Sequence, residues 1–223
     1  MAERVGPTGR VVATDLDTGM LEGLAVPNLE VRRHDIVTDD LPVGAFDLIH
    51  VRLVLEHLAG REQALRRMVA ALAPGGWLVV EDLDWVSITP VAGHGAGAIR
   101  RLVRALLPLM RLAGYDPAFG RRLAVEMTRL GLVEVRAEGV VPALQGGDER
   151  LDWARLSVVR MREVIRSLDG SGGPARRVAA GACRRFPGLW ERRLDGIDRL
   201  LDDPSFFALG PTMMTAFGRC PTR

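Results

Sequence analysis

Apolar positions in the first 85 residues fall into short runs, separated by turn residues and by stretches with helical spacing. A short apolar run that is bounded by turn residues predicts a buried β-strand. Four such runs are predicted as strands: Arg10–Thr14, Leu29–Arg33, Phe46–Val51 and Trp77–Glu81.

Helical segments are predicted between these strands. Gly19–Leu24 has the pattern of a short helix, and Gln63–Leu72 repeats apolar residues three and four positions apart, as one buried helix face does. We expect the second helix to stop at a turn formed by Pro74-Gly75-Gly76. Strands that alternate with helices predict an α/β domain with a parallel sheet and helices on both faces.

Helical spacing dominates the chain beyond Trp85. Two further strands are predicted at Val133–Val141 and Thr212–Arg219, as an antiparallel pair at one edge of the sheet. Helices are predicted at Ala96–Ala113, Phe119–Leu130 (closed by Gly131), Arg150–Leu168, Ala175–Phe186 and Leu189–Leu201. The chain is therefore divided into a binding domain over residues 1–145, a helical insertion over 146–205 that folds over the ligand cleft, and a final strand within 206–223.

Composition narrows the classes of function. The formal net charge is +2, and all 30 basic residues are arginine, which rules out catalysis through a lysine Schiff base. Near balance of charge argues against a nucleic-acid partner, and no apolar run is long enough to cross a membrane. The two cysteines, Cys183 and Cys220, suit a reducing cytoplasm. A small-molecule substrate is the expected partner, and the sequence leaves a homodimer open.

The most informative polar residue is Asp15, which ends the first predicted strand just before a helix opens. In nucleotide-binding α/β folds, a carboxylate at the end of the second strand accepts hydrogen bonds from a ribose. The alternative is that Asp15 only caps the turn that follows.

Four stretches, taken in order and with their spacing, resemble the class I S-adenosylmethionine-dependent methyltransferases, in particular the branch close to quinone-biosynthesis methyltransferases. They are residues 12–21, His34-Asp35-Ile36, residues 46–57 (Phe-Asp-Leu-Ile-His-Val-Arg-Leu-Val-Leu-Glu-His) and residues 72–82 (Leu-Ala-Pro-Gly-Gly-Trp-Leu-Val-Val-Glu-Asp). Residues 114–123 extend the likeness more thinly. The resemblance implies a Rossmann-like sheet, S-adenosylmethionine as cofactor, and methyl transfer to a small apolar or aromatic molecule.

The resemblance also implies which residues bind the cofactor. Asp15, followed by Leu16, would bind the ribose hydroxyls, and Met20 would pack on the adenine, with core packing as the alternative for Met20. Asp35 would accept from the adenine amino group beside the Ile36 N–H, with a turn-capping role as the alternative. His50 completes the predicted cofactor set.

Residues at the carboxyl ends of the third and fourth strands are predicted to face the substrate. Arg52 would position an anionic or carbonyl-bearing group, unless it is a surface arginine. His57 would act as a general base for a phenol or enol, unless it packs or caps a helix. The remaining predicted substrate residues are Asp82, Asp84 and Trp85, which follow the fourth strand next to Glu81.

The family's sheet has one more strand, with a glycine-rich loop, between the strands at 10–14 and 46–51. Gly6 and Gly9 look like the turn into the first predicted strand, so we expect this chain to lack that extra strand and loop. A non-catalytic relative that binds no cofactor is therefore an alternative function. A nicotinamide-dependent oxidoreductase is disfavoured because the chain has one tyrosine and no lysine, and the four histidines lack the spacing of metal ligands.

Overall fold

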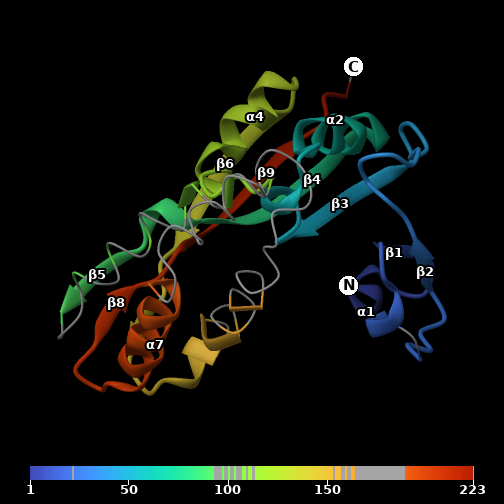
Figure 1. The fold of residues 1–223 in the computed structure, drawn as a ribbon. Helices are drawn as coiled ribbons and strands as arrows, with labels where there is room; N and C mark the ends of the chain where they lie inside the picture. The colour runs from blue at the N-terminus through green and yellow to red at the C-terminus, as the bar shows by residue number, and fades with distance from the viewer. Residues whose placement is uncertain are drawn as a thin grey trace.

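The computed structural model describes residues 1–21, 23–92, 114–152 and 189–222, together with isolated residues between 97 and 111 and between 154 and 163. The described chain is a mixed α/β structure with three sheets (Figure 1). No helix in this part of the chain is both long and apolar enough to cross a membrane.

The first sheet contains two parallel strands, β1 (Val11–Asp15) and β2 (Leu29–Arg33). The short helix α1 (Ala2–Val5) precedes them, and the predicted helix after β1 is a single 3₁₀ turn, η1 (Gly19–Leu21). In Figure 1, β1 and β2 form a pair of their own, separate from the larger sheet.

The second sheet has the order β3–β4–β9–β6. Its strands are β3 (Phe46–Arg52), β4 (Leu72–Asp84), β9 (Thr212–Arg219) and β6 (Val133–Val140). β3 and β4 are parallel, whereas β9 runs antiparallel to both β4 and β6. The predicted antiparallel pair is therefore confirmed, and β6 lies at the sheet edge.

The turn predicted at Pro74-Gly75-Gly76 lies inside strand β4, which is a correction. Helix α2 (Arg61–Ala71) ends before it, and the next residue, Leu72, already pairs with β3. Gly75 takes a left-handed φ of 80°, which glycine tolerates, and the register shifts locally between β3 and β4. The glycine pair thus forms an irregularity within the strand and does not separate a helix from a strand.

The main core lies between one face of the second sheet and two helices, α2 and α4 (Leu123–Arg129). Burial alternates along β4, so its even-numbered residues point into this core. Apolar side chains from both helices and the sheet pack together in this core. The fully buried ones include Leu65, Met68, Leu78, Val80, Leu123 and Met127. The core fixes the end of β4, where the candidate site lies.

A third, small sheet was not predicted from the sequence. It has the order β5–β8–β7, with β5 (Thr89–Ala92), β8 (Phe207–Leu209) and β7 (Ala143–Gln145). Each of these strands is joined by a few residues to one strand of the larger sheet, so the small sheet lies beyond the carboxyl end of β4 (Figure 1). A second apolar cluster packs it against α7 (Leu189–Asp202) and η5 (Glu149–Leu151).

Three short 3₁₀ turns connect the remaining elements: η2 (Leu55–His57), η3 (Trp85–Ser87) and η4 (Gly120–Arg122). The helix predicted at Phe119–Leu130 begins later, at Leu123, and ends at Arg129. Gly131, two residues further on, has the left-handed φ of 85° expected of a glycine that closes a helix. The helix predicted at Ala175–Phe186, most of Ala96–Ala113 and Trp153 lie outside the described residues.

Candidate functional site

The predicted cofactor carboxylates lie next to each other at the carboxyl ends of β1 and β2. Asp15 is paired in register with Arg33, and the backbone N–H of His34 donates to the Asp15 carbonyl over 2.9 Å. Asp35 follows directly. The parallel pairing of the two strands therefore brings Asp15 and Asp35 to one edge, as the sequence predicts.

Both carboxylates also shape their local turns. Asp15 Oδ1 accepts the Asp17 N–H over 3.0 Å, and Asp35 Oδ1 accepts the Val37 N–H over 2.8 Å. The turn-capping alternatives are thus realised, but each turn uses only one oxygen. Among the described contacts the second oxygen of each carboxylate has no protein donor, which leaves it available to a ligand.

Exposed apolar side chains accompany these carboxylates. Met20, on η1, is 93% exposed, and Leu16 is also exposed. Core packing, the alternative for Met20, is therefore not observed. Exposed carboxylate oxygens beside exposed apolar groups fit an adenosine, because its ribose offers hydroxyl donors and its base offers an apolar face. Ile36, by contrast, packs against the main core.

The predicted residues on β3 meet a glutamate of β4 on one face of the sheet. His50 Nε2 lies 2.8 Å from Glu81 Oε1, and Arg52 Nε lies 3.6 Å from Glu81 Oε2. The Arg52 side chain is largely exposed, whereas Glu81 is about three-quarters buried. Glu81 therefore holds the side chains of His50 and Arg52 at the carboxyl end of β3, with Arg52 the more accessible of the two.

Asp82 and Asp84 occupy the opposite face of β4, in the core. Asp82 is 0% exposed and Asp84 is 5% exposed, because both continue the buried alternation that begins at Leu78. The sequence predicts that they face substrate, and that role stays a prediction. The structure places both carboxylates beneath the carboxyl edge, where they hydrogen-bond to the protein.

Asp82 and Glu56 connect the end of β4 to η2 in both directions. Asp82 Oδ1 accepts the Val54 N–H over 3.1 Å, and Glu56 Oε2 accepts the Leu83 N–H over 3.0 Å. Burial, with the nearby Glu56 charge, raises the pKa of Asp82 to about 7, and burial also raises the pKa of Glu56. The segment after β3 is therefore fixed by two buried carboxyl groups whose pKa values are both raised.

His57 lies on η2 directly after Glu56, at the side of this pair. Its Nε2 is 3.4 Å from Glu56 Oε1, and its ring meets the Tyr115 ring edge-on at a centroid distance of 4.2 Å. Burial lowers the pKa of His57 and, with the Glu56 charge, raises the pKa of Tyr115. A neutral, partly exposed imidazole beside a carboxyl group can accept a proton, which is the chemistry predicted for His57.

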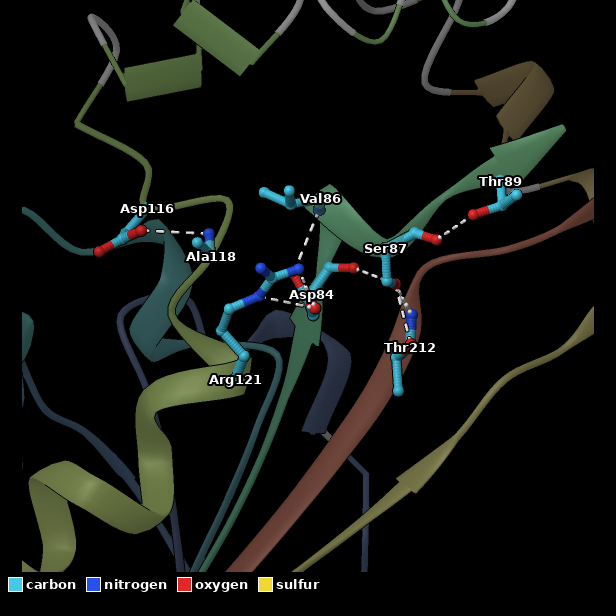
Figure 2. A network of polar contacts seen from close by, with 8 residues as sticks. All are labelled: Asp84, Val86, Ser87, Thr89, Asp116, Ala118, Arg121 and Thr212. Atoms are coloured by element: carbon cyan, nitrogen blue, oxygen red, sulfur yellow. Dashed lines mark hydrogen bonds and ion pairs between the residues drawn. The ribbon is translucent and has the colours of Figure 1, made fainter.

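A polar network at the end of β4 joins the larger sheet to the small one (Figure 2). Arg121 donates to Asp84 Oδ2 from Nε over 2.9 Å and from Nη2 over 2.6 Å. The Ser87 hydroxyl donates to the Asp84 carbonyl over 2.6 Å and accepts the Thr212 N–H over 2.7 Å. The network therefore fixes the junction between the two sheets, where the chain passes from β4 towards β5 and from β8 into β9.

Sequence reasoning assigned no role to Glu56, Tyr115 or Arg121. All three fall within stretches that carry the family resemblance, but none has a chemical signal of its own in the sequence. Their partners come from segments more than 25 residues away, as the 37-residue separation of Arg121 and Asp84 illustrates. In the part of the chain that the structure describes, no cluster of three or more His, Cys, Asp or Glu side chains is arranged to hold a metal.

Comparisons with known proteins find methyltransferases among the similar sequences. Residues 1–78 match the model of a methyltransferase domain. The chain is 32% identical over 123 residues to the methyltransferase str2 of Strobilurus tenacellus, covering 55% of this chain and 44% of str2. It is 34% identical over 100 residues to the ubiquinone/menaquinone biosynthesis C-methyltransferase UbiE of Laribacter hongkongensis, covering 40% of each. The chain thus spans less than half the length of these relatives.

Solved structures agree on the fold. The YcgJ protein of Bacillus subtilis matches with a TM-score of 0.52 at 12% identity, covering 95% of this chain and 82% of YcgJ. A putative methyltransferase from Bacillus halodurans matches with a TM-score of 0.52 at 14% identity, covering 96% of this chain and 84% of that protein. Residues 1–78 are therefore similar to a methyltransferase domain, and the described chain has the Rossmann-like fold of these solved structures.

Proposed function

We propose that this chain binds S-adenosylmethionine through Asp15 and Asp35 and transfers its methyl group to a small apolar or aromatic molecule. The observation that carries the proposal is the juxtaposition of these two carboxylates at one strand edge, within a segment that matches a methyltransferase domain. S-adenosylmethionine, when bound, supplies a methyl group that its sulfonium already activates for in-line displacement. The protein then has to bind, orient and shield the two reactants.

On the cofactor side, Asp15 would accept hydrogen bonds from the ribose hydroxyls, and Asp35 would accept one from the adenine amino group. Their second carboxylate oxygens support this role, since the local turns occupy only Oδ1 of each. Met20 and Leu16 would cover the base, because both side chains are exposed and follow Asp15 closely in the chain. His50 would contribute from the neighbouring sheet while Glu81 holds its ring.

On the acceptor side, His57 would remove the proton of a phenol or enol as the methyl group arrives. Its lowered pKa keeps the imidazole neutral near pH 7, and Glu56 lies beside its Nε2. Arg52, exposed at the end of β3, would attract an anionic or carbonyl oxygen of the acceptor. Trp85, whose side chain hydrogen-bonds to Glu56, would contribute an aromatic wall.

The unpaired edges of strands β1 and β3 are relevant to the affinity for the cofactor. Among the described residues, β1 pairs only with β2, and β3 pairs only with β4. Unpaired N–H and C=O groups along β1 and β3 favour pairing with another strand. One added parallel strand between them would bring Asp15, Asp35, His50 and Arg52 to a single carboxyl edge, so we expect a form of the protein that supplies such a strand to bind S-adenosylmethionine more tightly.

Replacing Asp15 by asparagine is expected to weaken S-adenosylmethionine binding by about 10- to 100-fold, which corresponds to the loss of about 1.5–3 kcal/mol from hydrogen bonds to a charged group. Asparagine keeps the Oδ1 acceptor for the Asp17 N–H, so the turn should survive. Titration calorimetry measures the dissociation constant.

The matched control is Asp17→Asn, which removes the same charge two residues away, where Asp17 Oδ1 only accepts the Gly19 N–H. We expect Asp17→Asn to change the dissociation constant less than about threefold, as for a solvent-exposed charge. Equal losses in both variants would mean that general charge, and not Asp15 contact, determines the affinity.

The same calorimetry distinguishes between an active enzyme and a non-catalytic relative that binds no cofactor. It should be run on this chain and on a form extended at its N-terminus. Binding in either form, followed by transfer of a labelled methyl group to a panel of phenols and quinols, supports the enzyme. Absence of binding in both forms would support a protein that has lost its cofactor. A cytoplasmic location, a homodimer, and the lack of nucleic-acid and membrane partners stay predictions.

A further inference from the structure

The strongest unassigned feature is the buried pair of carboxyl groups, Glu56 and Asp82. Glu56 is 1% exposed and Asp82 is 0% exposed, and they come from η2 and the end of β4. Among the described residues no arginine makes an ion pair with either group. Two buried, like-charged groups without a cation between them are unfavourable when both are ionised.

One oxygen of the pair has no hydrogen-bond partner among the residues that the structure describes. Asp82 Oδ1 accepts backbone N–H groups of the segment after β3, including Val54, but no described residue donates to the buried Oδ2. Glu56 uses Oε2 to accept the Leu83 N–H and also hydrogen-bonds to the Trp85 side chain. A carboxyl proton on Asp82 Oδ2 would supply the missing hydrogen and remove one of the two charges.

We propose that the buried pair of Glu56 and Asp82 holds a single proton at neutral pH, on Asp82, and that this proton fixes residues 53–58, which carry His57, to the carboxyl end of β4. The backbone at Leu53 needs support from its surroundings. It turns the chain out of β3 with a left-handed φ of 54°, a strained conformation for a residue with a Cβ atom. The two carboxyl groups hold this turn from both sides.

Other charged and titratable groups lie around the pair and are alternative sites for the proton. Burial lowers the pKa of His57 and raises that of Tyr115, so both are neutral near pH 7. The Asp84 and Asp116 carboxylates are each paired with an arginine, Arg121 and Arg122. From α2, Arg61 donates to the carbonyls of Leu55 and Gly114 and not to either carboxyl group. The proton is therefore assigned to Glu56 and Asp82.

The direction in which pH changes the stability follows from the linkage between proton binding at Asp82 and folding. The pKa of Asp82 is about 7 in the folded chain and close to 3.8 when solvated, so the folded state binds the proton more tightly. The free energy of unfolding should therefore fall as the pH rises through this interval. The chain is expected to lose several degrees of melting temperature, at least about 4 °C, between roughly pH 5 and roughly pH 8 relative to a variant without this group.

Asp82→Asn is that variant. Asparagine keeps an oxygen to accept the Val54 N–H and carries a permanent N–H where we place the proton. Melting curves of the wild type and Asp82→Asn should diverge as the pH rises, whereas Asp40→Asn, at a fully solvated carboxylate, should run parallel to the wild type. Parallel curves for the wild type and Asp82→Asn would overturn the proposal.

A second measurement covers the case in which Asp82→Asn does not fold. Infrared spectroscopy of the wild type at pH 7 should show the carbonyl stretch of a protonated carboxyl group. Glu56→Gln should weaken this band, because removing the Glu56 charge lowers the pKa of Asp82, while burial, the larger cause, still raises it. A wild-type spectrum without that band contradicts the proposal that the pair of Glu56 and Asp82 holds a proton at pH 7. The link to His57 rests on the proposed function, but neither readout measures methyl transfer, so the two ideas fail in different experiments.

Discussion

Replacing Phe119 by alanine is expected to destabilise the protein by about 3–5 kcal/mol, the range for removing a large aromatic side chain from a packed core. Phe119 is 1% exposed and packs in the main cluster against the sheet and α4. The guanidinium groups of Arg61 and Arg122 lie 5.9 and 5.7 Å from its ring centroid, and these cation–π contacts are lost with the ring. Thermal unfolding should shift downward by roughly 6–20 °C.

Val125→Ala is the matched control for Phe119→Ala, because Val125 lies on the next helix, α4, with its side chain exposed. We expect that change to stay within about 0.5 kcal/mol of the wild type. The comparison tests whether residues 116–122 are anchored to the end of β4 through the ring. Similar losses in the two variants would show that α4 as a whole, and not Phe119, determines the stability.

Arg121→Ala is expected to cost about 3 kcal/mol, because it leaves the buried Asp84 carboxylate without its cation. The value lies at the low end of the range for a broken buried pair, since the Arg121 side chain is 46% exposed and water can partly replace it. Chemical denaturation measures the change. The same variant should loosen the junction between the two sheets, where Asp84 also caps η3 (Figure 2).

Two further variants isolate the Arg121–Asp84 pair. Arg129→Ala breaks an exposed ion pair with Glu126 and should cost less than about 0.5 kcal/mol. Adding Asp84→Asn to Arg121→Ala should recover part of the loss, because it removes the unpaired charge. No recovery in the double variant would mean that the arginine acts through packing alone.

Regular elements with a strong apolar pattern could be predicted from the sequence. β2 at Leu29–Arg33 and β9 at Thr212–Arg219 have the predicted bounds, and the cap at Gly131 forms because only glycine adopts a left-handed φ at low cost. The strands of the small sheet could not be predicted. β7 and β8 have three residues each, too few to show an alternation, and they gain their stability from pairing with segments far along the chain.

The candidate site was predictable where a role depends on a position in the fold, and unpredictable where it depends on distant partners. Asp15 and Asp35 follow two parallel strands, so their shared edge could be foreseen. The burial of Asp82 was not predicted from the sequence, although Leu78 and Val80 precede it on the same face of the strand. The reciprocal contact between Asp82 and Glu56 could not be foreseen, because it depends on how η2 folds back onto β4.

The central claim is that the edge formed by β1 and β2 binds an adenosine group. A crystal structure of the protein with S-adenosylhomocysteine tests it most directly. We predict that Asp15 contacts both ribose hydroxyls and that Asp35 contacts the adenine amino group, with Met20 against the base. A bound ligand that lies beyond hydrogen-bond distance of both carboxylates would contradict the account.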